Sequence, residues 1–158
     1  MLLGGDIGGT KTVLALYAMD RGILGEALHK TRFASASYCC LEDMVAEFLR
    51  ETGAQPVAAS FGVAGPVTDR RHARITNLPW TISAENIGSS FGIRDVYLLN
   101  DLRAIAVAVP HLQPDSICTL HPGTFRPHGN IAVVAPGTGL GTAFLVWTGE
   151  GYKALASE

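Results

Sequence analysis

Apolar and polar positions follow two different patterns along this chain. Residues 1–7 and 12–19 form two short apolar stretches, and a shorter, more polar stretch covers residues 26–34. Such stretches predict β-strands, and their brief connections predict that neighbouring strands run antiparallel. From Leu41 the pattern changes, because apolar residues recur at helical spacing until Gly53, a natural helix C-cap.

Strands and helices alternate in the next segment. The stretch PVAASFGVAGP predicts a strand that ends at Gly65–Pro66, and SAENIGSSFG predicts a helix with Ser83 as its N-cap. A strand over residues 96–99 then precedes the small apolar helix of LRAIAVAVP, which ends at Pro110. The order β-β-β-α-β-α-β-α predicts an α/β fold in which antiparallel strands come first and parallel strands follow.

A second part of the chain begins after Pro110. Residues 111–130 are rich in proline, glycine and histidine, as is typical of a connection. The stretch IAVVAPGTGLGTAFLVW over residues 131–147 again predicts a strand, a glycine turn and a strand. We therefore expect one domain over residues 1–110, and over residues 111–158 a connection followed by the start of a second domain.

The composition restricts the classes of function. The 158 residues are 47% hydrophobic and 16% charged, which is enough to bury a core, and the net charge of −2 provides no basic surface for nucleic acid. No apolar run approaches the ~18 residues of a membrane span, and the N-terminus lacks the pattern of a secretory signal. The three cysteines, Cys39, Cys40 and Cys118, have no metal-binding spacing, which favours free thiols in a reducing cytoplasm.

Two glycine-rich turns, Asp6–Thr10 and Pro136–Gly141, join predicted pairs of strands. The first turn fits neither a P-loop, since Lys11 does not directly follow Gly9, nor a dinucleotide fingerprint, since a strand and not a helix comes next. Both turns offer backbone N–H groups that could bind phosphate oxygens, and a carboxylate such as Asp6 beside phosphate needs a cation such as Mg²⁺. The alternative is that the glycines only permit positive φ in two tight hairpins.

Three further polar segments are candidates for chemistry. Asn100–Asp101 follows a strand and precedes a helix, where ligands gather in α/β folds and where a carboxylate could take a proton from a hydroxyl. The alternative role of this pair is to cap the helix. Asn77, in the stretch TNLPW, could contact a ligand or orient the Pro-Trp corner, and Glu158 by itself is typical of a solvated end.

Four of these segments together resemble the bacterial glucokinase family of the actin/hexokinase/Hsp70 superfamily. GGDIGGTKT is similar to the first phosphate loop of that family, and FGVAGPV followed by TNLPW is similar to its next strand and sugar-side loop. LLNDLRAIAVAVPHL resembles the catalytic Asn-Asp segment, and APGTGLGTAFLV resembles the second phosphate loop. The first loop is shared with many sugar kinases, whereas the set of four is specific and covers nearly the whole chain.

The resemblance implies an actin-like ATPase (ribonuclease H-like) fold with a mixed five-stranded sheet, helices, and the first hairpin of a second domain. It also implies phosphorylation of glucose at its 6-hydroxyl by ATP and Mg²⁺, the entry step of glycolysis. Asp101 would be the catalytic base, and the sugar would be bound by Asn77, Asn100, Asp101 and Glu158. The phosphates of ATP would be bound by Gly5, Asp6, Ile7, Gly8, Gly9, Thr10, Gly137, Thr138 and Gly139, and Asp6 would hold Mg²⁺ through water.

The chain also departs from the family pattern, and other functions stay open. Pro136 stands where the family usually has a small residue, and the family continues beyond Glu158 with more of the sugar site and the adenine site. We therefore expect the 158-residue chain to be inactive by itself, and the apolar face of its second hairpin favours a homodimer. One alternative is a kinase of the repressor/open-reading-frame/kinase group that acts on another hexose or an amino sugar. The other is a non-catalytic sugar or nucleotide sensor.

Overall fold

The computed structural model describes residues 1–20, 23–136 and 140–156, and the chain forms two compact units, residues 1–101 and residues 102–158. The elements of the first unit are β1 (Leu2–Ile7), β2 (Lys11–Asp20), β3 (Ile23–Ala34), η1 (Ser35–Ser37), α1 (Leu41–Thr52), β4 (Ala58–Val63), β5 (Val67–Thr68), β6 (His72–Arg74), β7 (Thr81–Ser83), α2 (Ala84–Phe91) and β8 (Asp95–Asn100). Those that follow are α3 (Asp101–Ala108), η2 (Val109–His111), η3 (Pro114–Ser116), β9 (Ile131–Pro136), β10 (Leu140–Trp147) and β11 (Tyr152–Ala156), where η denotes a short 3₁₀ helix.

The first unit is built on a five-stranded sheet with the order β3-β2-β1-β4-β8. β1, β2 and β3 pair antiparallel, whereas β1 pairs with β4 and β4 with β8 in parallel. The predicted mixed five-stranded sheet is therefore confirmed. The parallel pairs arise because α1 and α2 carry the chain back to the starting edge between successive strands, as the crossover rule requires.

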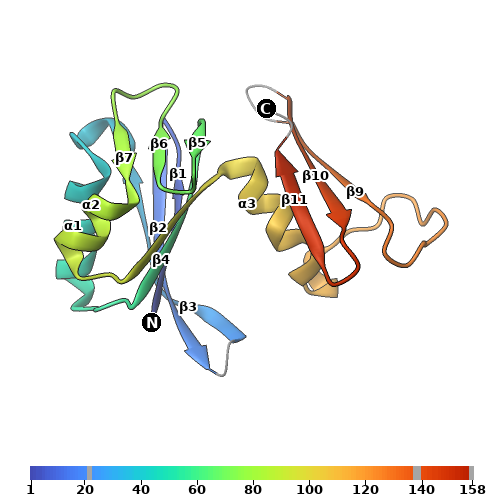
Figure 1. Ribbon diagram of the computed structural model, residues 1–158. Helices are drawn as coiled ribbons and strands as arrows, with labels where there is room; N and C mark the ends of the chain where they lie inside the picture. The colour runs from blue at the N-terminus through green and yellow to red at the C-terminus, as the bar shows by residue number, and fades with distance from the viewer. Residues whose placement is uncertain (21–22, 137–139, 157–158) are drawn as a thin grey trace. The chain divides into compact units, whose positions relative to one another are not determined.

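One face of this sheet carries the core, and α1 and α2 lie on that face (Figure 1). In β4 every second residue, Ala59, Phe61 and Val63, is buried because successive side chains of a strand point to opposite faces. On the opposite face Asp6 and Ser60 are exposed. The largest fully buried side chains of this core are Leu3, Ile7, Leu14, Leu41, Met44, Phe48, Phe61, Ile75, Ile82, Ile87 and Leu98.

Both helices of this core end at a glycine, and the sequence predicts the first of these ends. Gly53 follows α1 with φ 62°, and Gly92 follows α2 with φ 66°, so each glycine adopts the left-handed conformation that ends a helix. At the start of α2, the backbone N–H of Asn86 donates to the Ser83 hydroxyl at 3.3 Å, which confirms Ser83 as an N-cap.

A small three-stranded sheet, β5-β6-β7, lies between β4 and α2 and is absent from the predicted element order. Its first hairpin turns through Asp69 and Arg70, whose φ values are 51° and 56°, and is closed by a 3.0 Å bond from the Arg71 N–H to the Thr68 carbonyl. Two successive positive φ values define a type I′ turn. Strands of two and three residues are too short to show an alternating pattern in the sequence.

The second unit contains a three-stranded antiparallel sheet with the order β11-β10-β9. The predicted hairpin is present as β9 and β10, and the structure adds β11 as a third strand. Ala106 and Leu102 of α3 pack with Ala143, Leu145 and Ala154 of this sheet. The division between the units falls after Asp101, the first residue of α3, while the domain boundary expected at residue 110 stays a prediction. Within the described part of the chain, no helix combines the length and apolar character needed to cross a bilayer.

Candidate active site

The carboxyl ends of three parallel strands lie side by side in the first unit. In the register of the sheet, Ile7 of β1 is paired with Val63 of β4, and Val63 is paired with Asn100 of β8. Adjacent strands are about 4.8 Å apart, so the backbones at Ile7 and Asn100 are on the order of 10 Å apart. The first glycine turn and the Asn100–Asp101 pair therefore begin at the same edge of the sheet, where ligands bind in α/β folds.

The backbone N–H groups of the first turn differ in whether they donate a hydrogen bond within the protein. The Gly8 N–H donates to the Lys11 carbonyl at 3.1 Å and so closes the hairpin between β1 and β2. The N–H groups of Gly9 and Thr10, by contrast, donate to no described residue. Two neighbouring unpaired donors on a turn form a small nest for an anion. The turn thus offers Gly9 and Thr10 as donors, while the Gly8 N–H is already used.

The glycines of this turn are required by close approach and not by backbone conformation. Neither Gly8 nor Gly9 has a positive φ, so the alternative that they only permit positive φ is wrong for both. A Cβ on Gly8 would lie 2.8 Å from the Lys11 carbonyl oxygen, and one on Gly9 would lie 3.0 Å from the Cβ of Asn77. The second distance shows that Asn77, which is far from Gly9 in the sequence, packs directly against the turn.

Two further residues assigned to the first turn lie inside β1. A Cβ on Gly5 would lie 2.5 Å from a ring carbon of Phe61, so only glycine fits between these strands. The side chain of Ile7 is fully buried, and its carbonyl accepts a 2.9 Å hydrogen bond from the Ala64 N–H. Gly5 and Ile7 can therefore reach a ligand only through backbone atoms, and their contact with phosphate stays a prediction.

Asp6 is the exposed carboxylate at the end of β1. It is paired in register with Val13 on one side and Gly62 on the other. The described residues contain no cluster of three or more His, Cys, Asp or Glu side chains that could hold a metal by themselves. A single carboxylate fits Mg²⁺ of the kind that is bound chiefly by water and substrate phosphates.

Asn100 and Asp101 form a hydrogen-bonded pair at the end of β8. The Asn100 amide nitrogen donates to a carboxylate oxygen of Asp101 at 2.9 Å and to the Gly65 carbonyl at 3.4 Å. Only glycine fits at position 65, because a Cβ there would clash with the Arg74 carbonyl oxygen. Both Asn100 and Asp101 are half-buried. The carboxylate is therefore oriented by an amide and is still partly accessible, as a proton acceptor must be.

Four residues assigned to the site from the sequence lie outside the described residues. They are Gly137, Thr138 and Gly139 of the second glycine turn, and Glu158. Of the remaining assigned residues, the turn, Asn77 and the Asn100–Asp101 pair all belong to the first unit.

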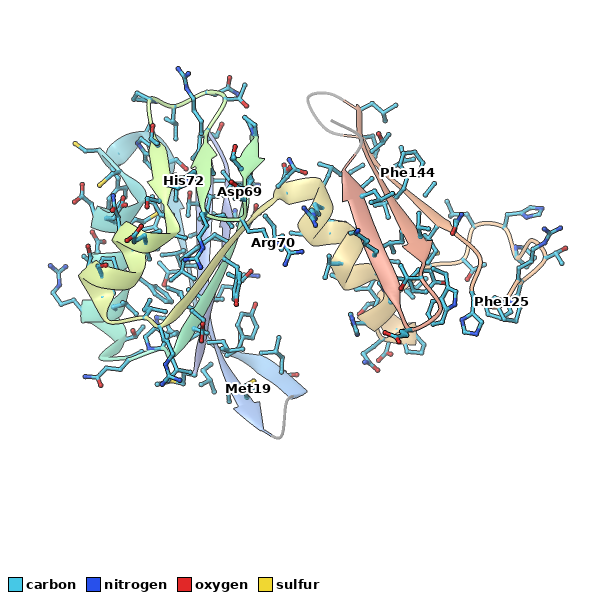
Figure 2. All side chains as sticks on the ribbon, in the orientation of Figure 1. Met19, Asp69, Arg70, His72, Phe125 and Phe144 are labelled. Atoms are coloured by element: carbon cyan, nitrogen blue, oxygen red, sulfur yellow. The ribbon has the colours of Figure 1, made fainter. Side chains whose placement is uncertain are left out.

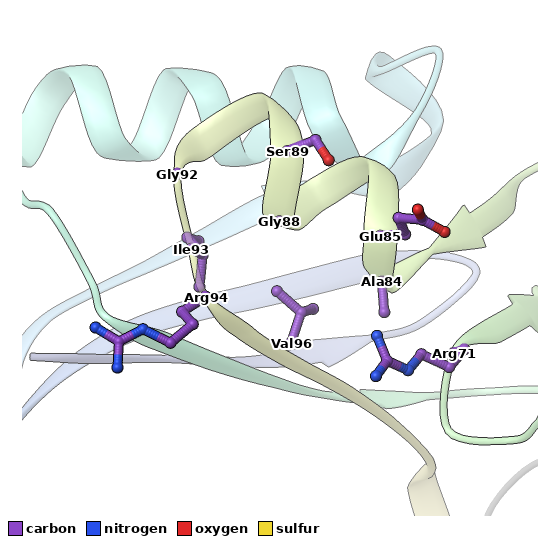
Figure 3. A pocket seen from close by; sticks show the side chains of 9 residues that line it. All are labelled: Arg71, Ala84, Glu85, Gly88, Ser89, Gly92, Ile93, Arg94 and Val96. Atoms are coloured by element: carbon purple, nitrogen blue, oxygen red, sulfur yellow. The ribbon is translucent and has the colours of Figure 1, made fainter.

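A surface hollow beside α2 lies away from these residues (Figure 3). Its lining includes Arg71, Arg94 and Glu85, so charges of both signs surround it, and none of the site residues assigned from the sequence contributes to it. We therefore place the candidate active site at the strand ends, where the open N–H groups and the oriented carboxylate are, and not in this hollow.

Comparison with known proteins identifies the family of this chain. The family model described as Glucokinase matches residues 3–158. The chain belongs to the glucokinase family. Among curated glucokinases, that of Nostoc punctiforme is 34% identical over 159 residues, which cover 100% of this chain and 46% of that protein. The glucokinase of Saccharophagus degradans is 36% identical and is matched over 97% of this chain and 48% of its own length.

Solved structures extend the comparison to the fold. The crystal structure of a glucokinase from an Antarctic psychrotroph superimposes with a TM-score of 0.86 at 32% identity, over 99% of this chain and 49% of that one. A ROK hexokinase from Thermus thermophilus shares the fold, with a TM-score of 0.63 at 23% identity. The predicted family and the actin-like ATPase fold are thus confirmed. The chain spans about half the length of the curated glucokinases that it matches.

Proposed function

We propose that this chain supplies the phosphate turn and the catalytic base of an ATP-dependent glucose kinase. The observation that carries the proposal is the in-register alignment of β1, β4 and β8, which brings the open donors of Gly9 and Thr10 to the same sheet edge as Asp101. A kinase needs these two elements close together, because phosphoryl transfer depends on positioning and on charge stabilisation more than on covalent catalysis.

Asp101 would act as the general base. Its carboxylate would accept the proton of the glucose 6-hydroxyl while that oxygen attacks the γ-phosphorus of ATP in line, and ADP would leave with the electrons of the broken P–O bond. Asn100 would serve here by orienting the Asp101 carboxylate through its 2.9 Å bond, and it would also contact a sugar hydroxyl. Asn77, packed against Gly9, would contact the sugar from the other side of the turn.

The first turn would hold the phosphates. The N–H groups of Gly9 and Thr10 would bind phosphate oxygens, and the backbone of Gly5, Ile7 and Gly8 would shape the turn. Asp6 would hold Mg²⁺ through water, and the ion would supply charge neutralisation on the phosphates. We assign Gly137, Thr138 and Gly139 to the same phosphates and Glu158 to the sugar on the family resemblance alone.

The base assignment is tested by Asp101→Asn in a version of the enzyme completed with the C-terminal half that its relatives have. Loss of a general base costs about 10²–10⁴-fold in rate, so kcat for glucose should fall by that factor while the KM for glucose changes little. Asp95→Asn is the matched control, because Asp95 is an exposed carboxylate at the opposite end of the same strand. A kcat near that of the unmodified enzyme for Asp101→Asn would remove Asp101 from the base role.

The substrate class is tested with a panel of hexoses and N-acetylated hexosamines in a coupled assay of ADP release. We expect glucose to be preferred, which rests on the names of the curated relatives. Preference for an N-acetylated sugar would favour a kinase of the repressor/open-reading-frame/kinase group. Sugar binding with no ADP release from the completed protein would favour a sensor instead.

A cytoplasmic location and self-association also belong to the proposal. Val134 and Phe144 on the second sheet are 58% and 46% exposed, and they support the expected homodimer through that sheet. Sedimentation of the chain should show a dimer that Phe144→Ser weakens.

A further inference from the structure

Two buried hydroxyl groups lie behind the first glycine turn. Among the described residues, Thr12 and Ser35 are the only polar side chains that are buried, and both are 0% exposed. Thr12 lies at the start of β2, and Ser35 begins η1 directly after β3. Burying a hydroxyl is unfavourable unless it forms hydrogen bonds, so the hydrogen-bond partners of these two groups indicate their structural role.

The hydrogen bonds form a chain that ends on the turn. The Ser35 hydroxyl donates to the Gly8 carbonyl at 2.7 Å, and the Thr12 and Ser35 oxygens are 3.1 Å apart. Because a hydroxyl has a single hydrogen and that of Ser35 is given to Gly8, Thr12 must be the donor to Ser35. Thr12 therefore fixes the rotamer of Ser35, and Ser35 in turn holds the Gly8 carbonyl.

Ser35 also holds the other side of the turn. Its backbone N–H donates to the Thr10 carbonyl at 3.1 Å, so a single residue binds the carbonyls on both sides of Gly9. A trans peptide is planar, and its N–H points opposite to its carbonyl. Since the Gly8 carbonyl points toward Ser35, the Gly9 N–H of the same peptide must point away from the buried pair.

We infer that Ser35, fixed by Thr12, is a positioning residue that aims the Gly9 N–H at a phosphate oxygen. The inference rests on the proposed function of the turn as a phosphate site. Without the two hydroxyls the Gly8–Gly9 peptide could rotate, because neither glycine has a side chain to restrict it. Preorganised donors bind and stabilise phosphate charge without the cost of reorienting when the ligand arrives.

The test is a titration of the 158-residue chain with inorganic tripolyphosphate in the presence of Mg²⁺, followed through the ¹⁵N–¹H resonance of Gly9. This measurement detects weak binding and needs no sugar or adenine site. Ser35→Ala removes both side-chain hydrogen bonds, the one to the Gly8 carbonyl and the one from Thr12. Thr12→Val removes only the bond from Thr12 to Ser35, because valine has nearly the same shape as threonine but no hydroxyl. Ser37→Ala is the control, since Ser37 is exposed in the same short helix.

We expect the dissociation constant to rise about fivefold or more for Ser35→Ala and about threefold for Thr12→Val, the effect of losing one hydrogen bond, while Ser37→Ala has no effect. Circular dichroism at the titration temperature identifies variants that are folded. If Ser35→Ala does not fold, the dissociation constant of Thr12→Val is compared with that of Ser37→Ala in its place.

Two results would overturn the inference, and they can be told apart. If the Gly9 resonance responds in the unmodified chain and both variants bind within the error of Ser37→Ala, Ser35 has no positioning role, while the phosphate turn stands. If the Gly9 resonance of the unmodified chain does not respond at any tripolyphosphate concentration, the turn is not a phosphate site, and the proposed function fails together with the inference.

Discussion

Buried side chains are distributed unequally between the two units of this chain. The first unit has a continuous core in which large residues from the five-stranded sheet, such as Phe61 and Leu98, pack against Met44 and Phe48 of α1. In the second unit, the buried residues among those described are Ala106, Ala143, Leu145 and Ala154. Three of these four are alanines, which bury little apolar area.

The same contrast is visible at the surface. The described part of the second unit leaves large apolar side chains in contact with water, including Leu120 at 95% and Phe125 at 86% exposure (Figure 2). Hydrophobic stabilisation is proportional to the apolar area removed from water. The first unit therefore provides most of the folding free energy, and it is also the unit that contains Asp101, Asn77 and the first glycine turn.

The largest expected effect comes from removing one phenylalanine ring in each unit. Phe61→Ala should lower the free energy of unfolding by about 3–5 kcal/mol, because it leaves a cavity in the first core. Phe144→Ala should lower it by no more than about 1–1.5 kcal/mol, measured on protein dilute enough to be monomeric, because Phe144 is 46% exposed. Denaturant unfolding measures both, and equal losses would contradict the unequal distribution of stability.

A smaller effect is expected from a substitution that stabilises the first unit and so increases the difference in stability between the units. Arg70 has a φ of 56° in the β5–β6 turn, a conformation that only glycine adopts without strain, so Arg70→Gly should stabilise the first unit by about 0.5–1 kcal/mol. Arg71→Gly is the matched control. Arg71 is not among the residues with positive φ, so glycine there should destabilise by a similar amount through backbone entropy. Destabilisation by Arg70→Gly would show that the turn is not strained.

The smallest expected effect concerns the cysteines. Burial raises the pKa of the Cys40 thiol above its ordinary value, whereas Cys118 in the second unit is exposed. Only the thiolate reacts with iodoacetamide, so a raised pKa lowers the reactive fraction of Cys40 at pH 8 and restores it as the pH rises. Mass spectrometry should find Cys40 alkylated several-fold more slowly than Cys118 at pH 8, with the ratio narrowing toward pH 10. Equal rates at pH 8 would mean that Cys40 is not protected by the first unit.

The sequence predicts elements best where the signal is local. Gly53 and Ser83 mark helix ends through their own backbone and side-chain chemistry, and both positions are confirmed. The strands of the small sheet are two or three residues long and depend on pairing with one another, so no local pattern indicates them. The packing of α3 with β10 and β11 is equally non-local, because it depends on residues about 40 positions later.

For the site, the sequence predicts candidate residues but not how the turn is built. The stretch GGDIGGTKT predicts a phosphate turn, but positive φ is the wrong reason for its glycines, which are required by contacts with Lys11 and Asn77. No pattern in the sequence indicates a role for Thr12 or Ser35. A hydroxyl residue is usually exposed, and only the fold brings positions 12 and 35 together behind Gly8.

The central claim is our proposal that the first unit carries the base and phosphate turn of a glucose kinase, whose curated relatives are about twice as long as this chain. The most direct measurement compares glucose-dependent release of ADP from ATP by the 158-residue chain and by the same chain completed with the C-terminal half of its relatives. We expect no sugar-dependent ADP release from the chain alone, because it spans only about half the length of the glucokinases that it matches, and activity after completion. Robust activity from the chain alone, or none from the completed enzyme, would contradict the account.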